Sequence, residues 1–204
     1  MSPPLGYGRV ILKPLTELEQ SAWRRVYEHF RDPEIAHLNG TPPSRMPLWL
    51  LKRILKADSR RSDRATFGIF DVSGDVSPDE VYIGTIELYD IKRTEATLGI
   101  IIGERSHWSK GFGPEAVRAL LKYAFEELCL ERVTLSTFED NPRAQSAFKK
   151  VGFAERRRVP AGKGRTDVQM ELRRGTWLAE QRSTLDVDAE GVSKGVDSEA
   201  ETSR

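Results

Sequence analysis

The clearest chemical feature of the chain is a glycine loop between an apolar run and a helical segment. The run from Ile100 to Ile102 leads into this loop, where Gly111 and Gly113 flank one aromatic residue. From Pro114 onward the sequence has helical periodicity, and proline suits a first helical turn because its missing N–H has no intrahelical role there. The N–H groups of a first turn lack partners inside the helix, and glycines let an anion approach the backbone. The order of strand, glycine loop and helix start therefore predicts a phosphate or pyrophosphate site.

Three interpretations of this loop are open at this point. Residues 111–116 fit the dinucleotide pattern G-x-G-x-x-A, but a nicotinamide-binding fold places that pattern after its first strand, among parallel strand–helix units. Here antiparallel strands are expected to precede it. The triphosphatase pattern G-x-x-x-x-G-K-[ST] does not occur in the sequence. The second interpretation is an ordinary strand–helix turn with two glycines, and the third follows from the rest of the chain.

Hydrophobic patterning predicts an α/β domain around the loop. Strands are predicted at 9–15, 66–72, 81–91, 95–103, 132–138, 153–159 and 166–173. Helices are predicted at 16–31, 47–57, 113–130 and 142–151. Thr16 and Glu19 are interpreted as a capping box at the start of the first helix. The segment 32–46 is predicted to be turn-rich. Short links between successive strands imply an antiparallel meander, and the later strand–helix–strand crossover implies one parallel pair. We therefore expect about six or seven mostly antiparallel strands flanked by about four helices.

Composition narrows the class of protein. The chain has 204 residues, of which 38% are hydrophobic and 31% charged, with a formal net charge of +1. This balance gives no general attraction to nucleic acid or to a membrane surface, and the sequence lacks a long apolar run, so a cytoplasmic protein is expected. The single cysteine, Cys129, excludes an internal disulfide and is predicted to be buried on the apolar face of the helix at 113–130. The three histidines lack ligand spacing, so no metal is expected.

The ends of the chain differ from its centre. Residues 1–8 are interpreted as an N-terminal extension and 9–175 as one domain. Residues 176–204 are predicted to be a disordered tail, because 183–204 contain six acidic and two basic residues and few large apolar ones.

Two segments of the C-terminal half resemble the GCN5-related N-acetyltransferase (GNAT) superfamily. They are HWSKGFGPEA, with Lys110, Gly111 and Gly113, and DNPRAQSAFKKVGF, with Asn141 followed by Gly152 and Phe153. The resemblance covers about 10–172 and is most specific over 98–153. LKPLTELE near the N-terminus and the closing GRTDVQMEL, which contains Asp167, look like the branch that acetylates ribosomal-protein N-termini. The resemblance implies the GNAT fold, with one splayed parallel pair of strands.

The resemblance also implies acetyl-CoA as co-substrate and no metal. In such proteins the pyrophosphate rests on the loop amides, here about 108–113, with Ser109 and Lys110 adding a hydroxyl and a charge. The pantetheine arm runs between the splayed strands, Asn141 anchors it, and Phe148 flanks the thioester. The implied contacts are Ile101, Ile102, Gly103, Trp108, Ser109, Lys110, Gly111, Phe112, Gly113, Asn141 and Phe148.

The catalytic positions depart from the family pattern. Thr97 and Ser136 stand where many members carry a glutamate base, Phe148 replaces the usual tyrosine acid, and Ala144 replaces a serine that some members carry. The replacement candidates are Glu87 on a neighbouring strand and Ser146 on the helix at 142–151. His37 and Asn39 lie in the segment expected to wall the acceptor pocket.

The resemblance predicts transfer of an acetyl group to a primary amine by direct attack in a ternary complex. A protein N-terminal α-amine is the first acceptor considered, since an amine of pKa about 8 loses its proton at pH 7 at a cost of about 1.4 kcal/mol, against about 4.6 for lysine. The alternatives are a small-molecule amine, such as an aminoglycoside or polyamine, and a non-catalytic acyl-CoA sensor. The mixed charge of 28–63 argues against a small cationic acceptor. A monomer or homodimer is expected.

Overall fold

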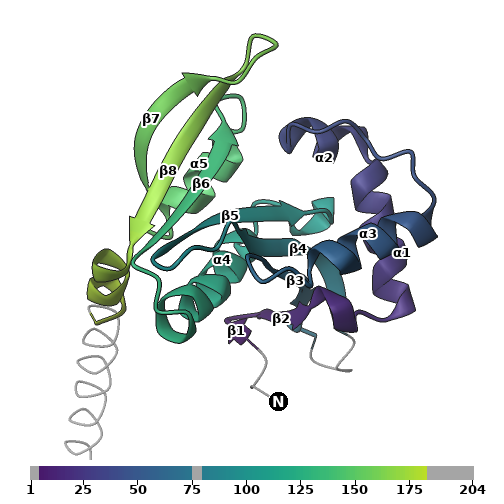
Figure 1. The fold of residues 1–204 in the computed structure, drawn as a ribbon, viewed down its shortest axis with the longest axis horizontal. Coiled ribbons are helices and arrows are strands. Elements are labelled where there is room, and N and C mark those ends of the chain that lie inside the picture. The colour runs from purple at the N-terminus through teal and green to yellow at the C-terminus, as the bar shows by residue number, and fades with distance from the viewer. Residues whose placement is uncertain (1–4, 75–79, 183–204) are drawn as a thin grey trace, which may run out of the picture.

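The computed structural model describes residues 5–74 and 80–182, which fold around one eight-stranded sheet (Figure 1). The strands are β1 (Leu5–Tyr7), β2 (Val10–Pro14), β3 (Ala65–Asp71), β4 (Val81–Tyr89), β5 (Glu95–Ile102), β6 (Arg132–Phe138), β7 (Ala154–Pro160) and β8 (Thr166–Arg173). They lie in the order β1-β2-β3-β4-β5-β6-β8-β7. The helices labelled in Figure 1 are α1 (Gln20–Arg31), α2 (Pro33–Leu38), α3 (Leu48–Asp58), α4 (Phe112–Lys122) and α5 (Pro142–Lys149). The predicted α/β fold is confirmed.

Among the described strands, β5 and β6 form the parallel pair, and they pair over three residues. The register joins Glu95 to Arg132, Ala96 to Val133 and Thr97 to Thr134, where the pairing ends. Beyond this point β6 runs away from β5 together with β7 and β8 (Figure 1). The predicted splayed pair is therefore confirmed.

The residues of β5 and β6 alternate between two faces of the sheet. Leu98 of β5 and Leu135 of β6 are buried in the cluster that contains the apolar side of α4. Because successive strand residues point to opposite faces, Thr97 and Gly99 of β5 and Ser136 of β6 lie on the face away from α4.

Helix α1 packs on the face opposite to α4. Trp23 and Val26 of α1 form a second buried cluster with Phe70 and Tyr82, whereas the strand neighbour Ile69 belongs to the α4 cluster. Helix α3 lies against α1 and faces outward (Figure 1).

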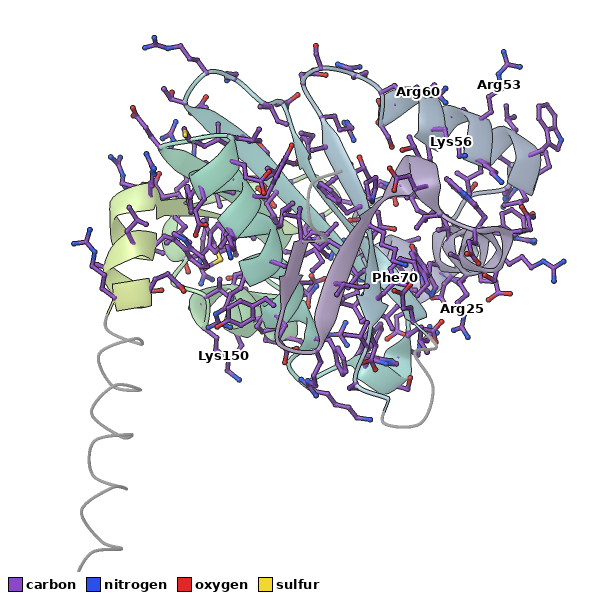
Figure 2. All side chains as sticks on the ribbon, turned by 90° about the horizontal axis from the view of Figure 1, so that it is seen from below. Arg25, Arg53, Lys56, Arg60, Phe70 and Lys150 are labelled. Atoms are coloured by element: carbon purple, nitrogen blue, oxygen red, sulfur yellow. The ribbon has the colours of Figure 1, made fainter. Side chains whose placement is uncertain are left out.

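Figure 2 shows basic side chains on this outer edge of the molecule. Arg53, Lys56 and Arg60 lie at α3 and the turn that follows it, and Lys150 lies at the far side, after α5.

The prediction of a turn-rich segment at 32–46 is wrong in its first part, which forms α2. Asp32 caps this helix: its Oδ1 accepts hydrogen bonds from the N–H groups of Glu34 and Ile35 at 2.9 and 3.1 Å. Pro33 at the first helical position adds to the start signal. The predicted capping box at Thr16 is also wrong, because residues 15–17 form a 3-10 turn and α1 begins at Gln20.

Cys129 is exposed, which contradicts the prediction of a buried thiol. Helix α4 ends at Lys122 and is followed by a π-helical turn over Tyr123–Glu127. A π turn inserts an extra residue, so the apolar face predicted for a straight helix does not continue past it. Cys129 lies beyond this turn in a left-handed conformation, with φ of 53°.

The folded part of the chain extends beyond 9–175 at both ends. Within the predicted extension, β1 pairs with β2, with Leu5 opposite Leu12. Residues 174–182 are helical, and Trp177 is 2% exposed against Phe125 in the main core. The predicted tail is therefore wrong at its start, and its remainder from 183, like residues 1–4, lies outside the described residues. No helix in the described ranges is long and apolar enough to cross a bilayer.

Candidate functional site

A cleft of about 720 Å³ opens where β5, the glycine loop, α4, α5 and α2 meet. Eight of the predicted cofactor contacts line it: Ile101, Ile102, Trp108, Ser109, Gly111, Gly113, Asn141 and Phe148. Residues from elements far apart in the sequence thus share one cavity at the open end of the splayed strands.

Three of the predicted cofactor contacts do not line the cleft. They instead contact other parts of the protein on the side of the loop away from the cleft. Phe112 is 4% exposed and packs edge-on against the His107 ring. Gly103 backs onto α1, where an added Cβ would lie 2.0 Å from Nδ1 of His29. Lys110 contributes its carbonyl, which accepts a 2.8 Å hydrogen bond from Nη2 of Arg9.

Arg9 fixes the loop to the start of α4. Its Nη2 also lies 2.5 Å from Oε1 of Glu115, and its guanidinium carbon is 4.2 Å from the centroid of the Phe112 ring. Hydrogen bonding to Glu115 raises the pKa of the Arg9 guanidinium. Gly111 takes the N-cap position with φ of 96°, a left-handed conformation that favours glycine. The loop is therefore held in shape by the protein's own contacts.

Gly113 provides the open surface that an anion needs. An added Cβ on Gly113 would have no heavy atom within 4 Å, although this residue lines the cleft in the first turn of α4. First-turn amides have no intrahelical partner, and the positive end of the helix dipole attracts an anion. A phosphate group therefore fits against this turn.

The edge of β5 next to the gap offers backbone groups to an extended ligand. The carbonyl of Thr94 accepts from the N–H of Arg132, and the carbonyl of Ile102 accepts from the Trp108 indole at 2.7 Å. Because the backbone groups of a strand alternate in direction, those of Leu98 and Ile100 also face β6. Pairing with β6 has ended at this level, so a ligand chain with amide groups has room to take its place.

Sequence reasoning missed the cationic residues of the cleft lining, which are Arg118, Arg143 and Lys150. The guanidinium carbon of Arg143 lies 3.5 Å from the centroid of the Trp108 ring, and burial lowers the pKa of this guanidinium. Arg118 of α4 also lines the cleft and donates to the carbonyl of Lys150 at 2.7 Å. Arg118 follows the glycine loop closely in sequence, and Arg143 follows Asn141, so both could have been proposed as phosphate contacts. Which face of each helix lines the cleft, however, depends on how α4 and α5 pack in the fold.

Helix α5 supplies the other wall of the cleft. Asn141 caps this helix, with its Oδ1 accepting from the N–H of Ala144 at 3.1 Å, so its side-chain amide is fixed at the cleft surface. Phe148 is 6% exposed and packs against Phe153. Ser146 lines the cleft and is exposed. A catalytic role for its hydroxyl requires such access.

The predicted acceptor residues lie on α2 and at its end. Asn39 lines the cleft. His37 is exposed, with its Nε2 3.7 Å from Oδ2 of Asp140, and its carbonyl accepts a 2.7 Å hydrogen bond from Arg165. Arg165 also donates to Asp140 at 2.7 Å and so joins the α2 wall to the wall formed by β6 and the hairpin.

Glu87 lies outside the cleft lining, on β4 opposite Gly99. Its Oε2 is 2.8 Å from Nη1 of Arg64 and accepts from the Thr66 hydroxyl at 3.3 Å. Its charge is therefore largely balanced. In the described ranges, no group of three or more His, Cys, Asp or Glu side chains is placed to hold a metal ion.

Comparison with known proteins identifies the family to which the chain is similar. A family model described as "Acetyltransferase (GNAT) domain" matches residues 9–154. The chain is similar to the probable N-acetyltransferase YjcK of Bacillus subtilis (strain 168), at 34% identity over 107 residues, 50% of this chain and 56% of that protein. It is also similar to an N-acetyltransferase 9-like protein of Caenorhabditis briggsae, at 27% identity over 158 residues, 72% of this chain and 76% of that protein. The match thus spans little more than half of the Bacillus subtilis relative.

Solved structures share the fold. A spermidine N-acetyltransferase from Vibrio cholerae, crystallised with CoA and spermine, superposes with a TM-score of 0.71 at 21% identity, covering 83% of this chain and 98% of that one. A GNAT-family acetyltransferase from Bacillus anthracis gives a TM-score of 0.67 at 15% identity, over 83% and 97%. None of these relatives singles out the ribosomal-protein branch, which stays a prediction. Since the family model covers well over half of the sequence, the chain belongs to the family of GNAT acetyltransferase domains.

Proposed function

We propose that the chain is an acetyl-CoA-dependent N-acetyltransferase that acts on a primary amine, with a protein N-terminal α-amine as its first acceptor. The observation that carries this proposal is the open first turn of α4 at Gly113, next to the free edge of β5 in one cleft. The diphosphate of a coenzyme would bind at the first turn of α4, and its amide-bearing arm would pair with the adjacent edge of β5.

The residues of the cleft fit acetyl-CoA, which supplies an activated acetyl thioester when bound. Amides between Trp108 and Gly113 would bind the diphosphate, and Arg118 and Arg143 would add charge-assisted contacts to phosphate oxygens. Backbone groups of Leu98 and Ile100 would pair with the arm, as a strand does. Asn141 and Phe148 would hold its inner end.

The acceptor amine would approach from the side of α2, whose end contributes Asn39 to the cleft. His37 would line this approach. We assign Ser146 as the hydroxyl nearest the leaving thiol and place Glu87, whose charge Arg64 balances, at the acceptor side of the gap. An α-amine fits because its neutral form is reached at a cost of about 1.4 kcal/mol at pH 7.

A polyamine is the second candidate acceptor, supported by a smaller hollow of about 430 Å³ beside the paired ends of β5 and β6. Asp63, Asp90 and Glu95 line it, and a polyamine has further cations for such acids. Hydrogen bonds from Lys92 and Arg132 already hold the pKa of Glu95 at about 2. Because those cations occupy the hollow as well, the α-amine ranks first.

Release of CoA thiol tests the proposal, with lysine-free peptides, spermine and an aminoglycoside as acceptors. Peptide N-termini should give the largest kcat/KM above a blank without acceptor. Cys129 is exposed and will react with thiol reagents, so Cys129→Ser protein provides the matched background. Larger kcat/KM for spermine would favour the polyamine, and acetyl-CoA binding without turnover of any amine would identify a sensor.

A further inference from the structure

A carboxylate lies at the open side of the splayed strands, on the wall formed by β6 and β8. The Ser136 hydroxyl donates a 2.8 Å hydrogen bond to Oδ2 of Asp167. In the β6–β8 register, Asp167 is opposite Phe138, two positions beyond Ser136, so these side chains share one face of the sheet. That face is the one directed away from α4, and the proposed acceptor would approach from it.

Gly99 of β5 is the counterpart of Ser136 across the gap. The two residues are the first same-face positions beyond the last β5–β6 pair. Gly99 has no side chain to fill the space, and β4 flanks it: an added Cβ would lie 3.4 Å from Oε1 of Glu87 and 3.5 Å from the Tyr89 ring. The gap therefore has Asp167 at one wall and Glu87 and Tyr89 at the other.

The electrostatics of Tyr89 connect the two walls. Burial raises the pKa of the Tyr89 hydroxyl, and the charges of Glu87, Asp90 and Asp167 act in the same direction. The Asp167 charge thus acts on the hydroxyl of the opposite wall in the direction of the Glu87 charge.

Asp167 differs from Glu87 in its charge balance. Glu87 is ion-paired with Arg64 at 2.8 Å. The cation nearest to Asp167 in sequence, Arg165, is instead paired with Asp140 at 2.7 Å. Within the described part of the chain, the hydrogen bond to Asp167 comes from the neutral Ser136 hydroxyl and no ion pair reaches its carboxylate. An arriving ammonium group meets an uncompensated negative charge there.

We propose that Asp167 is the catalytic residue that accepts the proton of the acceptor ammonium, oriented by Ser136. The assignment rests on the proposed acetyl transfer. The ammonium gives one proton to Asp167, and the nitrogen lone pair forms the C–N bond at the thioester carbon. The C–S bond breaks with its electron pair going to sulfur, which takes the second amine proton. Asp167 then returns its proton to water, so the transfer releases one proton in total.

The test compares Asp167→Asn and Asp167→Glu with wild type, using a lysine-free peptide as acceptor. Gln169→Ala is the matched control, because Gln169 is the next outward residue of β8 and binds Arg157. The measurements are kcat and KM between about pH 6.5 and 9.5, the Kd of acetyl-CoA and the thermal midpoint.

Asp167→Asn should lower kcat about a hundredfold near pH 7 and leave the Kd of acetyl-CoA unchanged. The deficit should shrink as pH rises past the pKa of the α-amine, since a neutral amine needs no base. A structural defect would instead lower the rate equally at every pH. The other charged groups around the gap are the same in all variants: Glu87, Asp90 and Arg64 on the β4 side, and Arg165 and Asp140 on the loop side. The difference between the pH profiles of variant and wild type therefore reports the change at residue 167.

Partial recovery in Asp167→Glu and unchanged activity in Gln169→Ala complete the expected pattern. A parallel deficit at all pH values, or full activity of Asp167→Asn, would overturn the assignment while the acetyltransferase activity of the wild type stands. A wild type that binds acetyl-CoA but turns over no amine would overturn the assignment together with the proposed function.

Discussion

Arg143 of α5 holds its guanidinium carbon 3.5 Å from the centroid of the Trp108 ring in the glycine loop. The contact joins the two walls of the cleft where the phosphates of a coenzyme would lie. Burial lowers the pKa of this guanidinium, so an anionic ligand would relieve the cost of a half-buried cation.

Arg143→Ala should therefore weaken acetyl-CoA binding about tenfold, because both a charge-assisted contact and the support of Trp108 are lost. Isothermal titration measures the change. Arg53→Ala is the control, since Arg53 projects from α3 on the outer edge of the molecule (Figure 2). Equal affinities of Arg143→Ala and wild type would remove Arg143 from the phosphate site.

Gly111→Ala should lower the free energy of unfolding by about 1–2 kcal/mol, since Gly111 has φ of 96°. An added Cβ would also lie 3.1 Å from Nη2 of Arg9, which adds crowding. Urea denaturation measures the loss. Gly162→Ala, with φ of 77° and no atom within 4 Å of the added Cβ, carries the backbone strain alone. A Gly111→Ala protein as stable as wild type would contradict the observed loop geometry.

His29 should make stability fall as pH decreases below about 6.5. Its ring is 6% exposed, stacks on Tyr82 and lies 3.2 Å from Glu104, and burial lowers its pKa. Between the lowered pKa and the unfolded value, the unfolded chain binds the extra proton, so stability rises with pH. Denaturation midpoints between about pH 7.5 and 5.5 measure this slope.

His29→Gln should flatten the slope, and His37→Gln should not, because His37 is exposed. Acidic groups with lowered pKa values, such as Glu104, lose their contribution only as pH falls below about 4.3, outside this window. An equal slope in His29→Gln and wild type would mean that another group carries the dependence.

Trp177→Ala should cost about 3–5 kcal/mol of stability, because the indole is 2% exposed against Phe125. Trp49→Ala is the matched control, since Trp49 is 65% exposed and its removal should change little. Thermal or chemical denaturation distinguishes the two. A small effect of Trp177→Ala would mean that residues 174–182 do not belong to the core.

The fold was predictable from the sequence because most elements have one clear hydrophobic period. The strand at 95–103 and the start of the helix after the glycine loop are confirmed, and so is the splayed pair that the family resemblance implies. The signal for α2 was present in Asp32 and Pro33, but a six-residue helix is too short to show a period. The prediction that Cys129 is buried was wrong because a π turn shifts the residues after it around the helix axis. The sequence pattern shows no sign of this turn.

The candidate site was predictable where it depends on local geometry. Gly111, Gly113 and Asn141 are recognised by their neighbours in sequence, and all three line the cleft. Arg143 and Asp167 were not assigned functional roles, because their roles depend on contacts across elements: a stack on Trp108 and a hydrogen bond from Ser136. Sequence spacing does not encode such contacts.

Titration of acetyl-CoA into wild type and Gly113→Leu is the most direct measurement of coenzyme recognition at the start of α4. Leucine is a better helix former than glycine, and an added Cβ there would meet no protein atom within 4 Å, so the thermal midpoint should not fall. Saturable binding to the wild type, weakened about a hundredfold in Gly113→Leu, is the expected result. Equal affinity in both proteins, or wild type that binds NAD but not acetyl-CoA, would contradict it.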